Sequence, residues 1–169
     1  MGGLIGQALA LRHPGKVKAL VLANTTSGYD AAGRAALQQR IQTVEQEGLE
    51  AVAEGTMARF FSEAFRTSQS ATVQRHQRLL LATDPEGYTA CAAALGDADM
   101  TARLGQIRVP TLLLAGGEDV STPPAGMQAM AAAMPHAECV TLPGCAHLSS
   151  VEQPWVFTDL TQAFIDGLA

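Results

Sequence analysis

The hydrophobic positions near the N-terminus follow a helical pattern and then a strand pattern. Residues 3–13 place apolar side chains at helical spacing, and the helix is expected to stop at His13-Pro14-Gly15. The next segment contains an almost wholly apolar run, Ala19 to Ala23. Such a run predicts a strand that is buried on both faces, as in a parallel sheet. A helix, a stop and a buried strand make half of an α/β repeat.

The middle of the chain, residues 30–104, shows helical patterns and no strand pattern. This stretch is too long to be a loop, and it predicts a helical insertion. Four helices are expected, at 30–48, 49–65, 70–84 and 85–99.

The α/β pattern resumes at residue 109 and continues to the C-terminus. The expected elements are a buried strand at 109–119, a methionine-rich helix at 123–134, a strand at 137–144, a loop at 145–154 and an amphipathic helix at 154–168. Trp155 is expected to anchor the last helix in the core.

Three buried strands separated by helices predict the α/β class, with parallel strands joined by right-handed crossovers. The chain divides into a core, residues 1–28 and 105–169, and a helical cap, residues 29–104. Three strands are few for a sheet with a cap of this size. The predicted fold is therefore part of a larger doubly wound sheet.

Composition narrows the classes of function. The chain has 169 residues, of which 47% are hydrophobic and 16% charged, and a net charge of −5. These values predict one globular domain and argue against a nucleic-acid partner. No apolar run is long enough for a membrane span, and the N-terminus has no pattern of a secretory signal. Three widely spaced cysteines, Cys91, Cys139 and Cys145, favour the reducing cytoplasm over a disulfide framework or a metal site.

Two side chains with catalytic potential follow the last two predicted strands. Asp119 follows the strand within 109–119, and His147 follows the strand within 137–144. The carboxyl ends of parallel strands lie at one edge of a sheet, so we expect these side chains to meet. A carboxylate that accepts a hydrogen bond from imidazole leaves the other ring nitrogen free as a general base. Taken singly, Asp119 is better explained as a turn or helix-cap residue and His147 as a loop residue, and it is their placement after successive strands that favours catalysis. Glu118 is the rival acid, but alternation along the strand should point its side chain the other way.

This order of elements resembles the C-terminal half of an α/β-hydrolase, in which nucleophile, acid and histidine follow one another along the chain. The opening, MGGLIGQALALRHPGKVKALVLANTT, resembles the segment after a G-x-S-M-G-G nucleophile elbow. The segments GYTACAAALGDAD, IRVPTLLLAGGEDVSTPP and GCAHLSSVEQPWVF are similar to 3-oxoadipate enol-lactonases. The resemblance implies a partial α/β-hydrolase fold, with the three C-terminal parallel strands, flanking helices and a helical cap insertion.

The resemblance also implies a nucleophile serine immediately before Met1, outside this sequence. It assigns to Met1 the position whose backbone group donates to the oxyanion, and to Gly2 a position where close packing excludes a side chain. A replacement nucleophile is not expected, because the remaining candidates share the loop of His147 or lack an elbow turn. Those candidates are Cys145, Ser149, Ser150, Thr25 and Thr26.

The predicted cap would cover the active site. Phe60 and Tyr88 are candidates for lining a substrate pocket, although packing of the cap onto the sheet explains them as well. Enol-lactone substrates of the family carry a carboxylate, and Arg59 is the candidate to pair with it. The other cap arginines are expected on solvated faces: Arg34, Arg40, Arg66, Arg75 and Arg78.

The resemblance implies a serine hydrolase that opens a small lactone or ester. Ring opening of an enol-lactone is the favoured reaction, and no metal or organic cofactor is expected. A general carboxylesterase or a haloperoxidase-like hydrolase is the alternative within the superfamily. A different possibility is that the chain alone is a truncated or split fragment without activity. The strand near 17–23 would then expose an apolar edge for self-association or for a partner chain.

Overall fold

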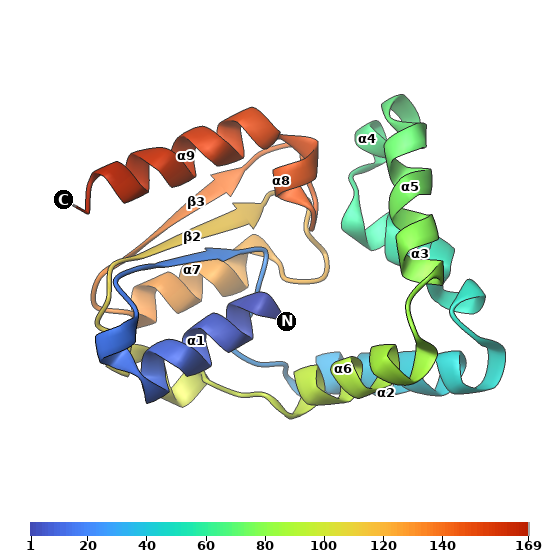
Figure 1. Cartoon of the computed structure of the whole chain (residues 1–169), viewed down its shortest axis with the longest axis horizontal. Coiled ribbons are helices and arrows are strands. Elements are labelled where there is room, and N and C mark those ends of the chain that lie inside the picture. The colour runs from blue at the N-terminus through green and yellow to red at the C-terminus, as the bar shows by residue number, and fades with distance from the viewer. Residues whose placement is uncertain (169) are drawn as a thin grey trace.

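The computed structural model describes residues 1–168 as a three-stranded sheet with helices on both faces, beside a separate group of helices (Figure 1). The strands are β1 (Leu20–Ala23), β2 (Thr111–Gly116) and β3 (Ala137–Leu142). The helices are α1 (Gly2–Arg12), α2 (Ala31–Glu47), α3 (Glu50–Phe60), α4 (Glu63–Ser68), α5 (Ser70–Leu81), α6 (Pro85–Asp97), α7 (Pro124–Ala133), α8 (Ser149–Glu152) and α9 (Pro154–Asp166), with short 3-10 turns η1 (Pro14–Lys16) and η2 (Thr101–Gln106).

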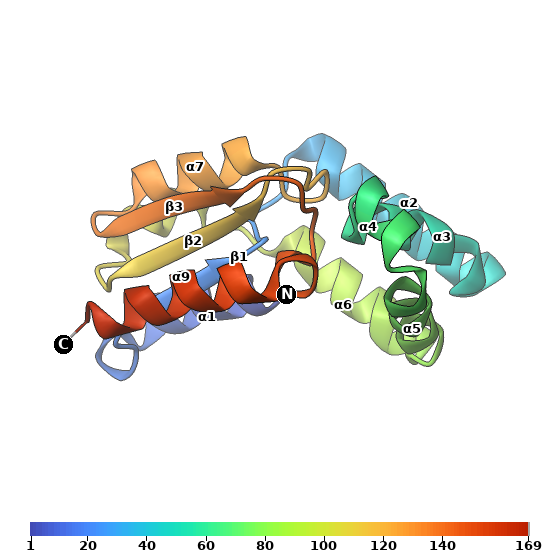
Figure 2. The same ribbon diagram turned by 90° about the horizontal axis from the view of Figure 1, so that it is seen from above.

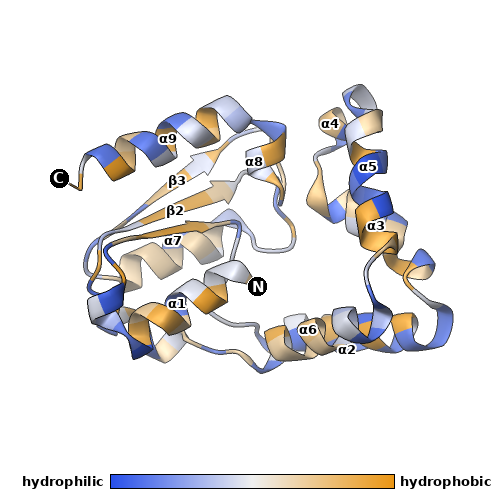
Figure 3. Ribbon diagram, in the orientation of Figure 1, coloured by the Kyte–Doolittle hydropathy of each residue, from blue (hydrophilic) through white to orange (hydrophobic). Residues whose placement is uncertain are grey.

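The sheet is parallel and has the order β1-β2-β3, which confirms the predicted α/β class and partial fold. Thr111 is the register partner of Leu20 on one side and of Ala137 on the other. Every residue of β2 is buried, because the strand lies between two others and is covered on both faces. This explains its unbroken apolar sequence. Figure 3 shows the hydrophobic colouring of β1 and β2.

Helices α1 and α7 cover one face of the sheet, and α9 covers the other (Figure 1). Met127 and Met130 of α7 pack in the same cluster as Leu113. On the opposite face, Phe157 of α9 packs against the cluster that contains Leu112. Full burial of a side chain such as Met127, Leu113 or Leu112 contributes about 1.5–3 kcal/mol, so these two layers hold the carboxyl ends of the strands in place.

The helices α2 to α6 form a group set to one side of the sheet, as Figure 2 shows, and all fall within the predicted cap. Leu37 and Ile41 of α2 and Ala92 of α6 form its own small apolar cluster. An isolated bridge between Gly28 and Asp99 lies where the chain leaves and re-enters the core. No helix within residues 1–168 is long and apolar enough to cross a membrane.

The cap has five helices rather than the four predicted, because the segment 49–65 breaks into α3 and α4. Phe61 is extended, and the side chain of Ser62 accepts a hydrogen bond from the backbone N–H of Phe65. A serine that caps the next helix competes with continuation of the preceding one, so the apolar periodicity alone was insufficient to predict the break.

Three further expectations near the ends of elements are wrong. The segment 145–154 is not only a loop, since it contains the short helix α8. Trp155 is 81% exposed and does not anchor α9, whose Phe157 and Phe164 make the contact with the sheet. A Cβ on Gly2 would meet no atom of residues 1–168 within 4 Å. The close packing occurs one residue later, because a Cβ on Gly3 would lie 2.4 Å from Oγ1 of Thr25.

Candidate active site

Asp119 lies in the turn after β2, where its carboxylate is surrounded by hydrogen-bond donors. Oδ1 accepts from the backbone N–H of Ser121 at 2.8 Å and of Thr122 at 3.0 Å. Oδ2 accepts from the Thr122 hydroxyl at 2.7 Å and from the Asn24 amide at 3.1 Å. The residue is only 2% exposed. A buried carboxylate with this many donors is held in one orientation.

His147 follows β3 and meets Asp119 across the edge of the sheet. Its Nδ1 lies 2.8 Å from Oδ2 of Asp119. Burial alone would raise the pKa of Asp119, but the hydrogen bond and charge of His147 and the hydrogen bonds from Thr122 lower it below its ordinary value. Asp119 is therefore ionised at neutral pH and accepts only. Nδ1 must donate, which leaves Nε2 of the neutral ring as a free base.

The rival acid lies elsewhere. Glu118 is exposed, and its backbone N–H donates to the carbonyl of Cys145 at 2.9 Å. Asp119, by contrast, is turned inward beneath Thr122, whose hydroxyl also lies 3.5 Å from Nδ1 of His147. The structure thus brings Asp119 rather than Glu118 to the histidine.

The loop that carries His147 is fixed by a contact of the ring and by hydrogen bonds of the residues that follow and precede the histidine. The Phe60 ring stacks on the imidazole, with centroids 5.3 Å apart. The backbone N–H of Leu148 donates to the Phe60 carbonyl at 2.9 Å. The backbone N–H of Ala146 donates to Oε1 of Glu152 at 2.6 Å. Residues of the cap and of α8 therefore set the position of the histidine.

Asn24, which the sequence did not identify, connects the site to the third strand end. It follows β1 with φ of 44°, in the left-handed region that Asn tolerates better than most residues. Its amide donates to Asp119 and to the Ala146 carbonyl, both at 3.1 Å, and its Oδ1 accepts from the Ser149 hydroxyl. Its place at a strand end was the signal that could have identified it.

A cavity of about 230 Å³ opens next to His147. Of the residues predicted for the site, Met1, Phe60 and Tyr88 line it. Burial lowers the pKa of the Met1 amino group, while the charge of Cys91 acts in the opposite direction. The oxyanion role assigned to Met1 and the substrate contacts assigned to Phe60 and Tyr88 stay predictions.

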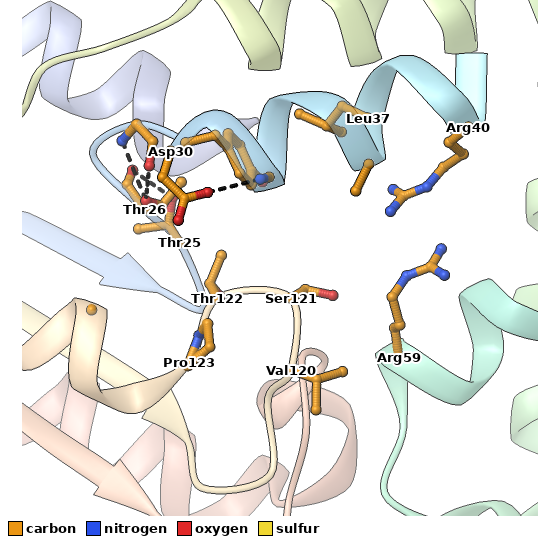
Figure 4. Close-up of a pocket in the computed structure, with 15 residues that line it drawn as sticks. Thr25, Thr26, Asp30, Leu37, Arg40, Arg59, Val120, Ser121, Thr122 and Pro123 are labelled. Atoms are coloured by element: carbon orange, nitrogen blue, oxygen red, sulfur yellow. Dashed lines mark hydrogen bonds between the residues drawn. The ribbon is translucent and has the colours of Figure 1, made fainter. Parts of the chain in front are cut away.

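Arg59 lines an adjoining cavity of about 460 Å³, shown in Figure 4, rather than the one that contains His147. Arg40 was expected on a solvated face, and this expectation is wrong. It is only partly exposed and lines both cavities, together with Thr25, Thr26, Ser121 and Thr122. It points inward from α2 because Leu37, one turn earlier on the same face, packs in the cap cluster.

Within residues 1–168, no hydroxyl or thiol forms a hydrogen bond with Nε2 of His147. The Cys145 thiol is buried, and this burial, followed by the charge of Glu152, raises its pKa to about 11. The thiol is thus protonated at neutral pH and a poor nucleophile. Ser149 is buried, and its hydroxyl donates to Oδ1 of Asn24. In the part of the chain that the structure describes, no three acidic, histidine or cysteine side chains are grouped as a metal site.

Comparison with known proteins supports the resemblance found in the sequence. The chain is 33% identical to 3-oxoadipate enol-lactonase 2 of Acinetobacter baylyi over 163 residues, which cover 96% of this chain and 60% of that protein. The crystal structure of a hydrolase from Pseudomonas aeruginosa is 35% identical, with a TM-score of 0.90, and the match covers 96% of this chain and 61% of the hydrolase. The enol-lactonase from Burkholderia xenovorans is 28% identical, with a TM-score of 0.93, over 98% of this chain and 63% of the lactonase.

The chain thus spans about 60% of the length of these relatives. A sequence profile of the alpha/beta hydrolase fold matches residues 1–154, which include all three strands, the cap helices and both Asp119 and His147. The chain belongs to the α/β-hydrolase fold family.

Proposed function

We propose that this chain carries the acid and the base of a serine hydrolase that cleaves a small ester or lactone. The observation that carries the proposal is the hydrogen bond between Nδ1 of His147 and buried Asp119, beside a cavity that His147 lines. In this arrangement, Asp119 orients the imidazole and stabilises the imidazolium that forms during proton transfer. Membership in the α/β-hydrolase family supports the same roles.

In the proposed reaction a serine hydroxyl attacks the carbonyl carbon while Nε2 of His147 takes the hydroxyl proton. Backbone N–H groups hold the tetrahedral oxyanion, for which Met1 occupies the position that the resemblance assigns. The intermediate then collapses, the bond to the leaving oxygen breaks, and His147 returns its proton to that oxygen. Water repeats the sequence on the acyl-enzyme and releases the acid. No step requires a metal or an organic cofactor.

Enol-lactone ring opening is the substrate assignment that we favour, because two of the relatives described above are enol-lactonases. The enol released from such a lactone would tautomerise to a ketone and give a 3-oxo acid. Phe60 and Tyr88 would contact the substrate beside His147, and Arg59 would pair with its carboxylate. A general carboxylesterase or a haloperoxidase-like hydrolase is the alternative assignment.

The test is a polypeptide in which a nucleophile segment of the family precedes Met1. Its rates on an enol-lactone and on a chromogenic ester identify the substrate class. We expect His147→Ala to lower kcat by about 10³-fold or more, with little change in KM. The exposed His136→Ala serves as the control. An unchanged rate after His147→Ala would show that the assignment of roles is wrong.

We further propose that residues 1–169 alone are inactive, as a fragment that needs its nucleophile from another segment or partner chain. The support is chemical, since residues 1–168 provide no hydroxyl or thiol in contact with Nε2. Ester turnover by purified 1–169 that disappears in His147→Ala would contradict this proposal.

A further inference from the structure

Arg40 and Arg59 extend from different cap helices, α2 and α3, toward each other across the larger cavity. Figure 4 shows their guanidinium groups facing one another, with Ser121 and Thr122 on the wall between them and the sheet. Both side chains are only partly exposed. The cavity therefore contains two positive charges that face each other from different helices.

Within residues 1–168, neither guanidinium forms a salt bridge, and the ion pair that the structure contains is that of Asp119 with His147. Asp30 is the acidic residue that lines this cavity, but it lies at the far end in Figure 4. Its Oδ1 accepts the backbone N–H of Gly33 at 2.7 Å and caps α2. The two arginines are thus left without a protein counter-charge.

Two like charges that face each other in a partly buried cavity repel, and this repulsion disfavours the arrangement unless an anion joins it. The pKa of Arg59 reflects both effects, because burial and, after it, the charge of Arg40 lower it, while Tyr88 acts in the opposite direction. One N–H of Arg59 donates to the Thr56 hydroxyl at 2.9 Å. This bond fixes the guanidinium and leaves its other N–H groups for a ligand.

We propose that Arg40 and Arg59 together form an anion subsite that holds one carboxylate of the ligand between their two guanidinium groups. A carboxylate offers two oxygens with about four acceptor positions, which suits donors arriving from two sides. The inference adds Arg40, which was expected on a solvated face, and makes the subsite a pair of cations rather than Arg59 alone.

The subsite would also set which molecules are bound. Arg40 lines both this cavity and the one around His147, and the two cavities share Thr25 and Thr26. A ligand with its carboxylate at the arginines would therefore extend its other end toward the imidazole. This orientation rests on the proposed function, whereas binding of the carboxylate does not.

Isothermal titration of the full 169-residue chain with hexanoate, adipate, dimethyl adipate and inorganic phosphate tests the proposal. We expect hexanoate and adipate each to bind at least about tenfold more tightly than the uncharged dimethyl adipate, since the charge-assisted hydrogen bonds to a carboxylate are lost in the ester. Phosphate should bind more weakly than adipate. Equal binding of the diester, or tighter binding of phosphate, would overturn the carboxylate assignment.

Variants locate the site. Arg40→Gln and Arg59→Gln should each weaken adipate binding about tenfold, and Arg40→Lys should restore only part of the loss because an ammonium lacks the planar fork. Arg75→Gln, on the exposed α5 surface, removes the same charge and should leave binding unchanged. An equal loss in Arg75→Gln would show a general charge effect and refute the subsite.

The binding titration and the hydrolysis assay test the subsite and the proposed function independently of each other. Circular dichroism establishes that each variant is folded, and the comparison of acid with diester on the unmodified chain decides the proposal even if a variant does not fold. Retained adipate binding with no hydrolysis in any extended polypeptide would count against the proposed function alone. Hydrolysis without acid binding would count against the subsite alone.

Discussion

Five hydrogen bonds end on the carboxylate of Asp119, and they come from four residues in three segments of the chain: Asn24, Ser121, Thr122 and His147. Hydrogen bonds to a charged acceptor contribute about 1.5–3 kcal/mol each, although neighbouring bonds do not add independently. The same bonds lower the pKa of Asp119 against the opposing effect of burial. This one side chain thus stabilises the fold as well as orienting the imidazole.

Asp119→Asn should lower the free energy of unfolding by about 2 kcal/mol at pH 7, because the new amide would place donors against the donors of Thr122 and His147. The lowered pKa also fixes the pH dependence. Ionised Asp119 contributes its full stabilisation at a pH well above 3.8, the ordinary pKa of an aspartate. This contribution to stability is lost as the pH falls through the lower pKa of Asp119 in the folded protein. Urea denaturation from pH 7 to pH 3 should therefore show a shallower loss of stability in the variant. Parallel curves for the two proteins would contradict this.

Gly116 ends β2 directly beneath the histidine loop, where a Cβ would lie 2.0 Å from the carbonyl oxygen of Ala146. Gly116→Ala should lower the free energy of unfolding by about 2 kcal/mol or more and should shift the NMR resonances of the His147 ring. Gly126→Ala is the matched control, because nothing lies within 4 Å of its Cβ and the residue is in α7. It should stabilise the protein by roughly 0.5–1 kcal/mol. A tolerated Gly116→Ala would show that the loop is not held as closely as described.

The residues of the site differ in how far sequence reasoning could reach them. Asp119 and His147 follow strands whose apolar runs are unmistakable, so their meeting could be predicted from the geometry of a parallel sheet. Asn24 also follows a strand, but an amide has no chemistry that marks it, and its role depends on a left-handed backbone conformation. Arg40 was missed because its direction depends on how α2 packs against α6, which the helical period does not determine.

At the level of elements, the break between α3 and α4 and the short helix α8 belong together. The backbone N–H and hydroxyl of Ser62, at the break, both donate to Glu152 of α8. The same carboxylate accepts the backbone N–H of Ala146, the neighbour of His147. Neither α8 nor the break was predicted, because each depends on these contacts between distant segments rather than on local propensity. We infer that Glu152 connects the cap to the histidine loop.

Glu152→Ala should lower the free energy of unfolding by about 2 kcal/mol, since it leaves the N–H groups of Ala146 and Ser62 without their acceptor. It should also speed amide hydrogen exchange in α4 and in residues 145–148 together. Glu54→Ala removes an exposed carboxylate of α3 and serves as the control. It should change the free energy of unfolding by no more than about 0.5 kcal/mol and should leave amide exchange in α4 and in residues 145–148 unchanged. Faster exchange in the loop alone, with α4 unaffected, would refute the connection.

At the scale of the whole molecule, the apolar pattern of the sequence predicts the elements that form the core. The positions of α1, β1, β2, α7, β3 and α9 follow from apolar periodicity, because each element buries one face or both. β1 lies at the edge of this sheet. Within residues 1–168, β1 pairs with β2 alone, and Val21 and Ala23 are only partly buried. Ile5 and Leu9 of the neighbouring α1 are 59% and 45% exposed.

An unpaired apolar edge beside exposed aliphatic side chains favours association, since pairing would satisfy the free backbone groups and cover the apolar surface. We propose that residues 1–169 associate with a second copy through β1 and α1. Sedimentation velocity at protein concentrations of roughly 1 to 100 μM, where weak dimers form, should show a concentration-dependent dimer. Ile5→Glu should shift it toward monomer, whereas Leu79→Glu, which adds the same charge at a side chain of α5 that is 58% exposed, should not. Of the two substituted residues, Ile5 lies on the helix that packs against β1, whereas Leu79 lies on α5. An equal effect of both variants would therefore refute association through this edge, and so would a monomer at every concentration.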